Sequence, residues 1–191
     1  MKHIIISLTL LTLLSISTVA QEASPEASTV PASEKTVLLK KGDFYIGPRV
    51  ALGAVAGASF GLGAAAEYGF DDNIGIGAFA GYSSYSEEFS GFGGSYKWSY
   101  TNILLLATGS YHYDVLKNDK LDTWGEVGLG YNIGSVSYEG PTIPGLIEPT
   151  AGGFVYTVTA NARYFFSSNL AFFASVGYGL GIARVGVDFK L

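Results

Sequence analysis

The sequence predicts an all-β protein, an eight-stranded antiparallel up-and-down transmembrane β-barrel, from three observations. The 191 residues include 26 Gly, 13 Tyr and 12 Phe, a composition that disfavours helices and suits strands. Apolar residues alternate with small or polar ones over segments of about ten residues, which gives each predicted strand two different faces. Compact polar connections alternate with long ones along the chain, as they do in transmembrane barrels.

The first 20 residues have the three parts of a secretory signal peptide. Lys2 supplies the positive start, residues 4–14 form an apolar core, and Thr18, Val19 and Ala20 provide a small-residue cleavage site. We expect this segment to be removed, because its apolar core is short for the alternative, a retained membrane anchor of about 20 residues. The chain contains no Cys, so we expect neither a lipid anchor at the cleavage site nor disulfide bonds.

Residues 21–41 are rich in Ala, Ser, Glu and Pro and contain no aromatic residue. Such a segment buries too little apolar surface to offset its ordering entropy, so we predict a flexible periplasmic lead. Residues 42–191 then form the barrel as one domain. The net charge is −5 and basic residues do not cluster beyond Lys40 and Lys41, so the sequence predicts no nucleic-acid partner.

The first three predicted strands cover residues 44–52, 60–70 and 74–82. Alternation is clearest in the second, where Phe60 and Leu62 alternate with Gly61 and Gly63. A helix is the alternative for residues 50–66, which are uncharged and carry glycines at four-residue spacing, the pattern of paired apolar helices. The alternation and the helix-weakening glycines favour strands.

The remaining five predicted strands cover residues 98–113, 126–133, 154–164, 172–178 and 183–191. The first of these is the least regular, because residues 103–107 are continuously apolar. The others alternate throughout, and the last does so without interruption to the terminal Leu191.

The connections support an even number of strands. Compact polar turns are predicted at residues 71–73, near Asp114 and at residues 167–169. Long loops are predicted at residues 83–97 and 138–153, and short connections near Gly57 and Gly179. In an up-and-down barrel this places all three compact turns at one end and both long loops at the other, as expected for periplasmic turns and outer loops.

The two faces of the predicted strands favour a membrane barrel over a soluble lipocalin-type barrel. One face carries the large apolar residues, with Tyr68, Phe70, Tyr111, Tyr113 and Tyr164 near the turns where an aromatic girdle is expected. The other face carries Gly, Ser, Thr, Asn and isolated charges. Because eight strands enclose just enough space for side chains, we expect the large apolar residues to face lipid.

The last strand ends in Phe-Lys-Leu, with apolar residues at alternate positions from Ala183 to Leu191. It resembles the closing strand of small OmpA/OmpX-like outer-membrane barrels of Gram-negative bacteria, although their usual terminal Phe is replaced by Leu191. The resemblance implies outer-membrane lipid and the barrel insertion machinery as partners. It further implies a role in envelope integrity, adhesion, host interaction or limited solute passage.

Seven charged residues share the predicted inward face. In a narrow, partly dry interior they should pair, because unpaired buried charges are costly. We predict that Arg49 pairs with Glu67, directly opposite if the first hairpin centres near Ala58 and diagonally if it centres one residue earlier. The set forms either a structural network that closes the pore or a polar path for small solutes: Arg49, Glu67, Glu126, Arg163, Arg184, Asp188 and Lys190.

The two predicted long loops carry the residues most suited to contact an extracellular ligand or host surface. Exposed aromatic and apolar side chains on a rigid scaffold often mark a contact surface, and the alternative is that they extend the strands and pack on each other. The candidates are Tyr85, Phe89, Phe92, Tyr96, Ile143 and Leu146.

The sequence predicts no enzyme, metal site or cofactor. Residues 61–66 and 75–80 match a relaxed dinucleotide fingerprint, but neither leads from a strand into an amphipathic helix. His112 is the only histidine after the signal peptide. If the turn centres on Lys117, His112 lies opposite Asp122, and we expect a structural pair in preference to a catalytic His.

Overall fold

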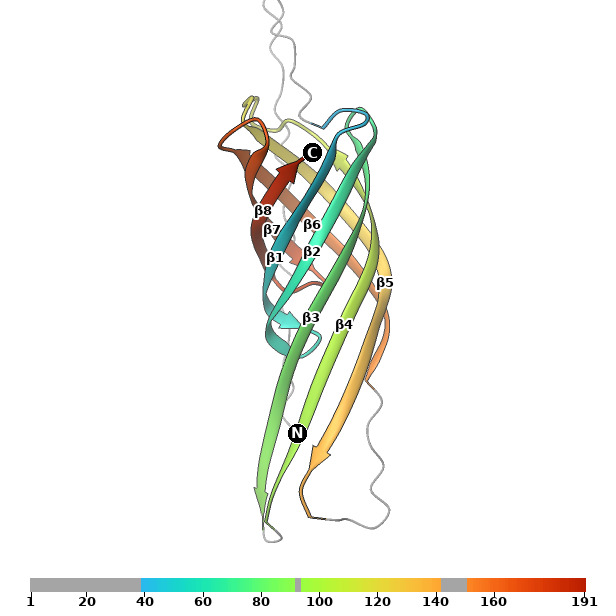
Figure 1. Cartoon of the computed structure of the whole chain (residues 1–191), viewed down its shortest axis with the longest axis vertical. Coiled ribbons are helices and arrows are strands. Elements are labelled where there is room, and N and C mark those ends of the chain that lie inside the picture. Colours follow the sequence, from blue (N-terminus) through green and yellow to red (C-terminus); the bar gives the residue numbers. More distant parts are fainter. Residues whose placement is uncertain (1–38, 92–93, 142–150) are drawn as a thin grey trace, which may run out of the picture. The chain divides into compact units, whose positions relative to one another are not determined.

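The computed structural model describes residues 39–91, 94–141 and 151–191. In this part of the chain eight antiparallel strands form one closed barrel in chain order (Figure 1), which confirms the predicted fold class. The strands are β1 (Phe44–Val55), β2 (Ala58–Asp71), β3 (Ile74–Gly91), β4 (Gly94–His112), β5 (Leu121–Glu139), β6 (Gly152–Phe165), β7 (Leu170–Tyr178) and β8 (Ala183–Lys190). Among the described residues no helix is long and apolar enough to span a membrane.

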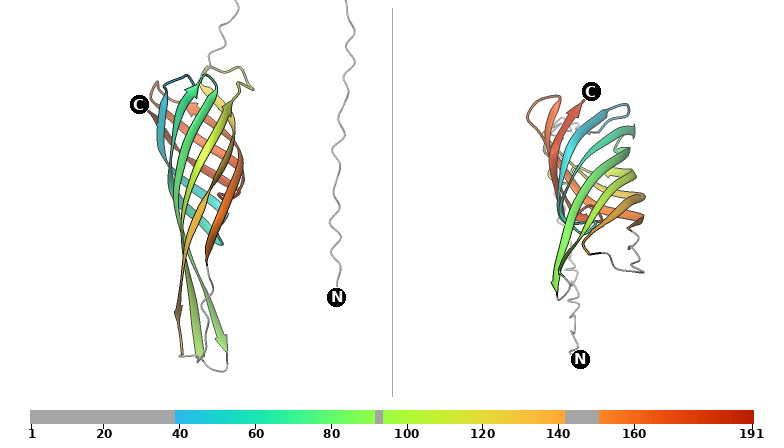
Figure 2. Two further views of the ribbon diagram at one scale, coloured as in Figure 1. Left: turned by 90° about the vertical axis from the view of Figure 1, so that its right-hand side faces the viewer. Right: turned by 60° about the horizontal axis from the view of Figure 1, so that its bottom comes forward.

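Most strands are longer than predicted, β3 and β5 by nine residues or more, and the prediction of a long loop at residues 83–97 is wrong. The β3–β4 ladder continues from Ser83 opposite Asn102 to Gly91 opposite Gly94. The β4–β5 ladder likewise reaches Lys97 opposite Glu139. As Figure 2 shows, β3, β4 and β5 extend well past the other strands. The alternation in this segment is therefore that of paired strands, while residues 142–150 of the second predicted loop lie outside the described residues.

The first hairpin turns at Ala56 and Gly57, both of which have positive φ, 48° and 92°. Such angles at two central residues characterise the tight turns that suit twisted hairpins. Gly57 has a second constraint, because an added Cβ would lie 2.7 Å from the ring of Tyr85 on β3. A glycine here therefore meets both the backbone angle and the packing of the longer strand over the turn.

The described barrel begins slightly before the predicted boundary at Gly42. Leu39 is fully buried, and its carbonyl accepts a hydrogen bond from the amide of Asn73 at 3.4 Å. The amide of Lys41 donates to Asp72 Oδ1 at 3.1 Å, and the amide of Gly42 donates to the Gly69 carbonyl at 2.9 Å. Residues 39–42 are thus tied to the β2–β3 turn.

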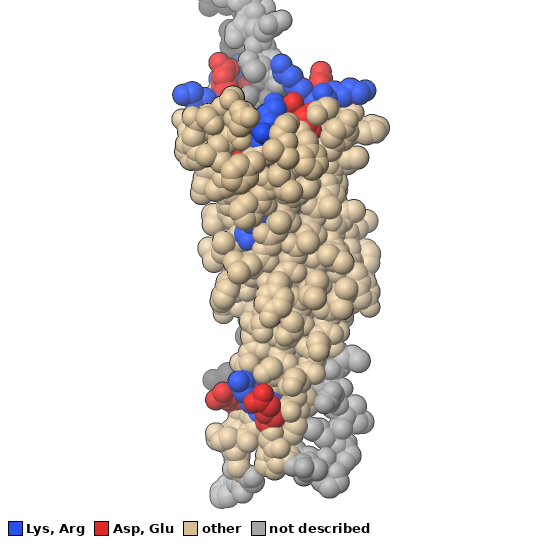
Figure 3. Space-filling model, in the orientation of Figure 1, with Lys and Arg blue, Asp and Glu red and all other residues tan. Residues whose placement is uncertain are grey.

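The outer surface of the barrel is an apolar band. Val127, Leu129 and Val158 are more than half exposed on it, and charged side chains gather at the two ends of the face seen in Figure 3. The five aromatics predicted for a girdle near the turns are all exposed on this surface. On β5 the band ends after Ile133, and Ser135 and Ser137 continue the same face. This surface matches a hydrocarbon layer bounded by polar ends.

The interior is filled in layers that follow the inward residues of β4. His112 and Ser110 lie at the turn end, Leu106 and Leu104 lie in the middle, and Asn102 follows them. The apolar layer is completed by Phe79 and Leu180. The expectation that the large apolar residues face outward therefore fails for these four. Within the continuous apolar run, Ile103 and Leu105 face lipid while Leu104 and Leu106 face inward.

The depth of the lipid-facing band predicts a graded cost for a charge on β5. Leu129 lies near the middle of the band, whereas Ser135 lies on the same face six residues further, about 20 Å along the strand. Leu129→Arg should lower the free energy of unfolding by about 2–4 kcal/mol, and Ser135→Arg by about 0–1 kcal/mol. Urea unfolding of the protein refolded in lipid measures both. Equal costs at the two positions would contradict a membrane boundary between them.

Candidate functional site

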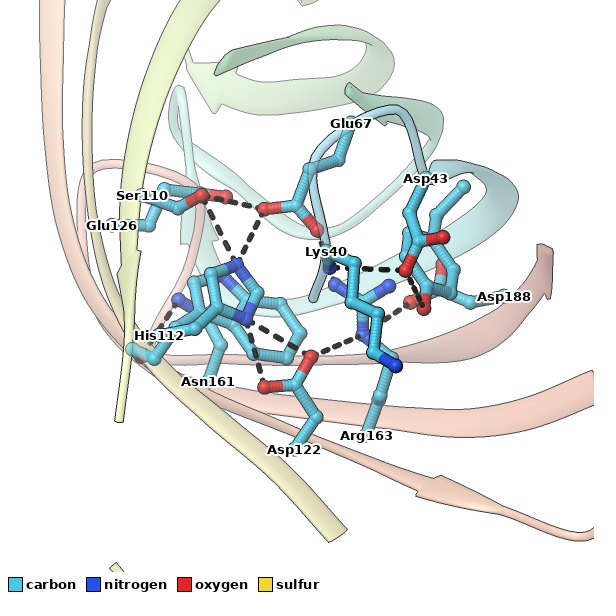
Figure 4. A network of polar contacts seen from close by, with 12 residues as sticks. Lys40, Asp43, Glu67, Ser110, His112, Asp122, Glu126, Asn161, Arg163 and Asp188 are labelled. Carbon is cyan, nitrogen blue, oxygen red and sulfur yellow. Dashed lines mark hydrogen bonds and ion pairs between the residues drawn. The ribbon is translucent and has the colours of Figure 1, made fainter. Parts of the chain in front are cut away.

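The charged side chains of the interior gather toward the turn end of the barrel, in what is here called the interior network. Figure 4 shows the part of it around Glu67, His112, Asp122 and Arg163. All seven predicted inward charges belong to it, and three further residues complete it. Its ion pairs involve Asp43, Arg49, Glu67, His112, Asp122, Glu126, Arg163, Arg184, Asp188 and Lys190.

Arg163 of β6 occupies the centre of the interior network and is 1% exposed. Its guanidinium pairs with Glu67 through Nη2, and its Nε lies 3.3 Å from Asp122 Oδ2. The guanidinium carbon lies 3.9 Å from the ring centre of Tyr45 and 4.5 Å from that of Trp124. The two rings thus stabilise the cation at a position where its Nη1 has no hydrogen-bond acceptor among the described residues.

Arg49 pairs with Asp188 of β8, and the predicted Arg49–Glu67 pair is wrong. Arg49 lies opposite Gly63, whereas Glu67 lies opposite Tyr45. The reason is the hairpin register, since the chain turns at Ala56 and Gly57 and not near Ala58. The Nη1 of Arg49 also donates to the carbonyls of Pro48 and Val187, each at 3.1 Å.

Arg184 of β8 forms a separate branch of the interior network. Its Nη2 donates to Glu126 Oε1 at 3.1 Å and to Thr159 and Asn161 at 3.0 Å each. Its Nε donates to Ser175 Oγ at 2.9 Å. Phe173 lies between this branch and Arg49, with guanidinium carbons 3.8 Å (Arg49) and 5.6 Å (Arg184) from its ring centre.

Lys190, the last of the predicted inward charges, lies at the rim of the barrel. Its Nζ is 2.8 Å from Asp43 Oδ2, and the Lys190 side chain is 31% exposed. An ion pair that is open to water contributes little to stability compared with the buried pairs of Arg49 and Arg163.

His112 has a carboxylate at each ring nitrogen. Nδ1 lies 2.8 Å from Asp122 Oδ1, which gives the expected His112–Asp122 pair, although Trp124 is the residue directly opposite in the ladder. Nε2 lies 2.9 Å from Glu67 Oε1. With both carboxylates ionised, both nitrogens donate, and this arrangement favours the imidazolium form of the ring. Five cations then balance the five carboxylates of the interior network.

Ser110 contacts His112, and His112 contacts Asp122, which is the order of contacts in a hydrolase triad. The surroundings of these residues do not suit hydrolysis. Ser110 Oγ donates to Glu67 Oε1 at 2.5 Å, so its proton is directed away from the histidine. The cavity beside the interior network is about 20 Å³, enough for about one water molecule. No group of three or more His, Asp or Glu among the described residues is placed to hold a metal ion.

The predicted outer-loop residues are strand residues where the structure describes them. Tyr85 on β3 stacks on Tyr100 of β4 with ring centres 4.6 Å apart, and Phe89 stacks on Tyr96 at 5.4 Å. Phe92, Ile143 and Leu146 lie outside the described residues.

Sequence reasoning did not include Asp43 or the aromatic partners of the arginines in the site. Asp122 and Trp124 lie at alternate positions before Glu126 and therefore on the same, inward side of the strand. A fifth predicted strand that began four residues earlier, at residue 122, would have placed both inside. Phe173 was visible as the one aromatic on the inward parity of the seventh strand.

A closed ring of eight strands with an apolar exterior and a filled, charged interior defines the class of fold: a small transmembrane β-barrel of the OmpA/OmpX-like type. The outer membrane protein OprG from Pseudomonas aeruginosa has this fold, with a TM-score of 0.52 and 13% identity over 80% of this chain and 97% of that chain. A structure from the de novo design of transmembrane β-barrels gives a TM-score of 0.50 and 16% identity over 80% and 98%.

These likenesses confirm the predicted fold and, at such identities, nothing finer. No protein-family model and no curated protein matches the chain.

The corrected pairing predicts which residues are energetically coupled. Removing Arg49 or Asp188 alone should cost about 3–5 kcal/mol, because each substitution leaves a buried charge without its partner. The double variant Arg49→Met with Asp188→Asn should cost clearly less than the sum, whereas Arg49→Met with Glu67→Gln should be closer to additive. Urea unfolding of the wild type, the single variants and the two double variants, each refolded in lipid, measures the coupling free energy of both pairs.

Lys190→Met serves as the control for these cycles, because its pair lies at the partly exposed rim and should contribute no more than about 1 kcal/mol. A coupling between Arg49 and Glu67 as large as that between Arg49 and Asp188 would overturn the register described above.

Proposed function

We propose that the protein is an integral outer-membrane β-barrel that is closed to solutes, is not catalytic, and acts in envelope integrity or adhesion through the part of β3, β4 and β5 outside the membrane. The observation that carries this proposal is the filled interior. Arg163, Arg184 and Asp188 are almost fully buried, and the cavity among the charges holds about one water molecule.

A narrow porin-like channel is the alternative, and the apolar layer argues against it. The ring of Phe79 lies over glycines of β2 and β3 inside the barrel, where a Cβ added to Gly63 or Gly81 would lie 2.6 Å from it. Phe79, Leu104, Leu106 and Leu180 form one buried cluster between the interior network and Asn102. An apolar layer of this kind interrupts a polar path, because water and ions do not enter it readily.

A soluble lipocalin-type barrel is the lesser alternative. Such a barrel carries its apolar face inward around a ligand cavity. Here the aliphatic side chains of Val127, Leu129 and Val158 are exposed, and the interior is charged. The exterior therefore supports membrane lipid as the first partner.

The barrel insertion machinery is the second proposed partner. β8 closes the ring by pairing with β1, and the amide of Leu191 donates to the Phe44 carbonyl at 2.9 Å. Phe189 is 45% exposed on the lipid face and stands nearest to the terminus among the aromatic residues. The closing strand is thus both the last structural element and the proposed insertion signal, after export through the cleaved signal peptide.

Conductance distinguishes the closed barrel from the channel. The refolded protein in planar bilayers should show no defined single-channel steps, because the interior network and the apolar layer together fill the pore. A large trimeric porin under the same salt and voltage is the positive control. Reproducible steps whose size changes in Phe79→Ala would establish the channel instead.

Surface labelling tests which end of the barrel is outside. Since the chain has no Cys, single cysteines at Ser90 and Asp119 report the two ends, and both positions are exposed. Ser90→Cys should react with a membrane-impermeant maleimide on intact cells, whereas Asp119→Cys should react only after lysis. Labelling of Asp119→Cys alone on intact cells would invert the topology.

A further inference from the structure

The two faces of β3, β4 and β5 exchange character where these strands leave the barrel. Beyond Tyr82, Ile103 and Ile133, the side that faced lipid becomes polar, with Ser84, Ser86, Ser99, Thr101, Ser135 and Ser137. The side that continues the interior becomes aromatic. We call it the aromatic face, and it comprises Tyr85, Phe89, Tyr96, Trp98, Tyr100 and Tyr138.

The aromatic face is a continuous row of rings. Tyr85 and Tyr100 stack at its base, and Trp98 packs on Tyr138 with ring centres 4.9 Å apart. Tyr138 also contacts Tyr96 at 6.3 Å, and Tyr96 stacks on Phe89 at 5.4 Å. The rings thereby hold one another in place, which lowers the entropy lost when a ligand binds them.

No other strand among the described residues pairs with this part of the sheet. The β2–β3 ladder ends at Leu62 opposite Tyr82, and the β5–β6 ladder ends at Ile133 opposite Gly152. At its base the extension still contacts the β1–β2 turn, where Tyr85 lies over Gly57, while Phe89 further along is 45% exposed. With a polar outer side and an aromatic inner side, this part of the sheet is unsuited to contact with lipid.

The composition of the aromatic face restricts its partner. The lipid-facing band is largely aliphatic, whereas this face has one aliphatic residue, Val136, among phenol and indole rings. Glu87 lies directly opposite Trp98 in the ladder, which puts a carboxylate beside the indole. Large rigid rings with polar edges suit a ligand that is itself apolar on one side and polar at its rim.

A pyranose ring has this character. Its axial C–H groups form an apolar side that stacks on an aromatic face, and its hydroxyls at the rim donate to carboxylates and phenols. The charge of the extension selects among sugars. Glu87 is the charged residue on the aromatic face, while Lys97 on the opposite side lies between Glu88 and Glu139, so the described extension is negative overall. Sulfated or acidic sugars would meet this negative field, and neutral sugars would not.

We propose that the aromatic face binds neutral glycans, with Trp98 and its neighbour Tyr138 as stacking platforms and Glu87 as an acceptor for sugar hydroxyls. The inference deepens the adhesive role proposed above and rests on it only in placing the extension outside the membrane. The inference names the class of ligand, a chain of uncharged hexopyranoses. The surface includes Tyr85, Phe89 and Tyr96, which the sequence predicts as contact residues.

Binding is tested with the full chain refolded into lipid nanodiscs and titrated by calorimetry. The probes are cellohexaose, maltohexaose and N-acetylchitohexaose, with a heparin hexasaccharide as the anionic comparison. At least one neutral probe should bind, and the heparin fragment should bind at least about tenfold more weakly. Trp98→Ala should weaken binding about tenfold or more, as truncation of a central aromatic contact does.

Two matched variants separate a contact from a structural role. Trp98→Phe retains a ring and should keep most of the affinity, while Ser99→Ala, the next residue on the opposite side of β4, should leave it unchanged. Heat-modifiable gel migration confirms that each variant is folded. Absence of binding by the folded wild type, or equal binding by Trp98→Ala, would overturn the inference.

The inference and the proposed function fail in different experiments. Glycan binding in nanodiscs with Ser90→Cys unreactive on intact cells would retain the ligand class but refute its surface role. If Ser90→Cys is labelled on intact cells and the barrel does not conduct, but no glycan binds, only the proposed ligand class is refuted. Tighter binding of the heparin fragment than of every neutral probe would also refute it, because the charge argument would then be wrong.

Discussion

The structure depends on one constraint: charges enclosed by eight strands must be neutralised by other side chains, because there is no room for bulk water. Arg163, at 1% exposure, meets this constraint by contacting carboxylates from three other strands and two aromatic rings. Its partners are shared in turn, since Glu67 also contacts His112. The pairs therefore act as one layer that links opposite walls of the barrel, and the ladder hydrogen bonds between neighbouring strands cannot do this.

Space for that layer comes from inward positions without a side chain. A Cβ at Gly75 would lie 2.2 Å from Ser110 Oγ and 2.6 Å from Glu67 Oε1, so the residue opposite Ser110 has to be glycine for this hydrogen bond to form. The same reasoning applies to the apolar layer, where glycines on β2 and β3 accommodate the ring of Phe79. At these positions glycine is therefore required by the large side chains that lie against it in the interior.

Periodicity predicts the barrel, its strand number and the inward position of all seven charges, because parity depends only on counting along one strand. It does not predict which charges meet. Arg49 and Glu67 lie on adjacent strands with the right parity, yet the turn at Ala56 and Gly57 shifts Glu67 opposite Tyr45. Partners across the barrel, such as Glu67 and Arg163, depend on the tilt and stagger of all the strands together. A single sequence contains no local signal for that arrangement.

The failure to predict the β3–β5 extension has a related cause and bears on function. The predicted loop at residues 83–97 contains serines and aromatics at alternate positions, and its apolar residues do not lie on the lipid-facing parity. In fact the strand continues while its environment changes from lipid to water, so the outer side becomes polar. Beyond Tyr85, which lies over Gly57 of the first hairpin turn, the inner side is no longer enclosed by the ring of strands. It is instead lined with interlocked rings from Tyr85 to Tyr138, which the barrel below does not need for closure, and this surplus is the physical reason to seek a ligand there.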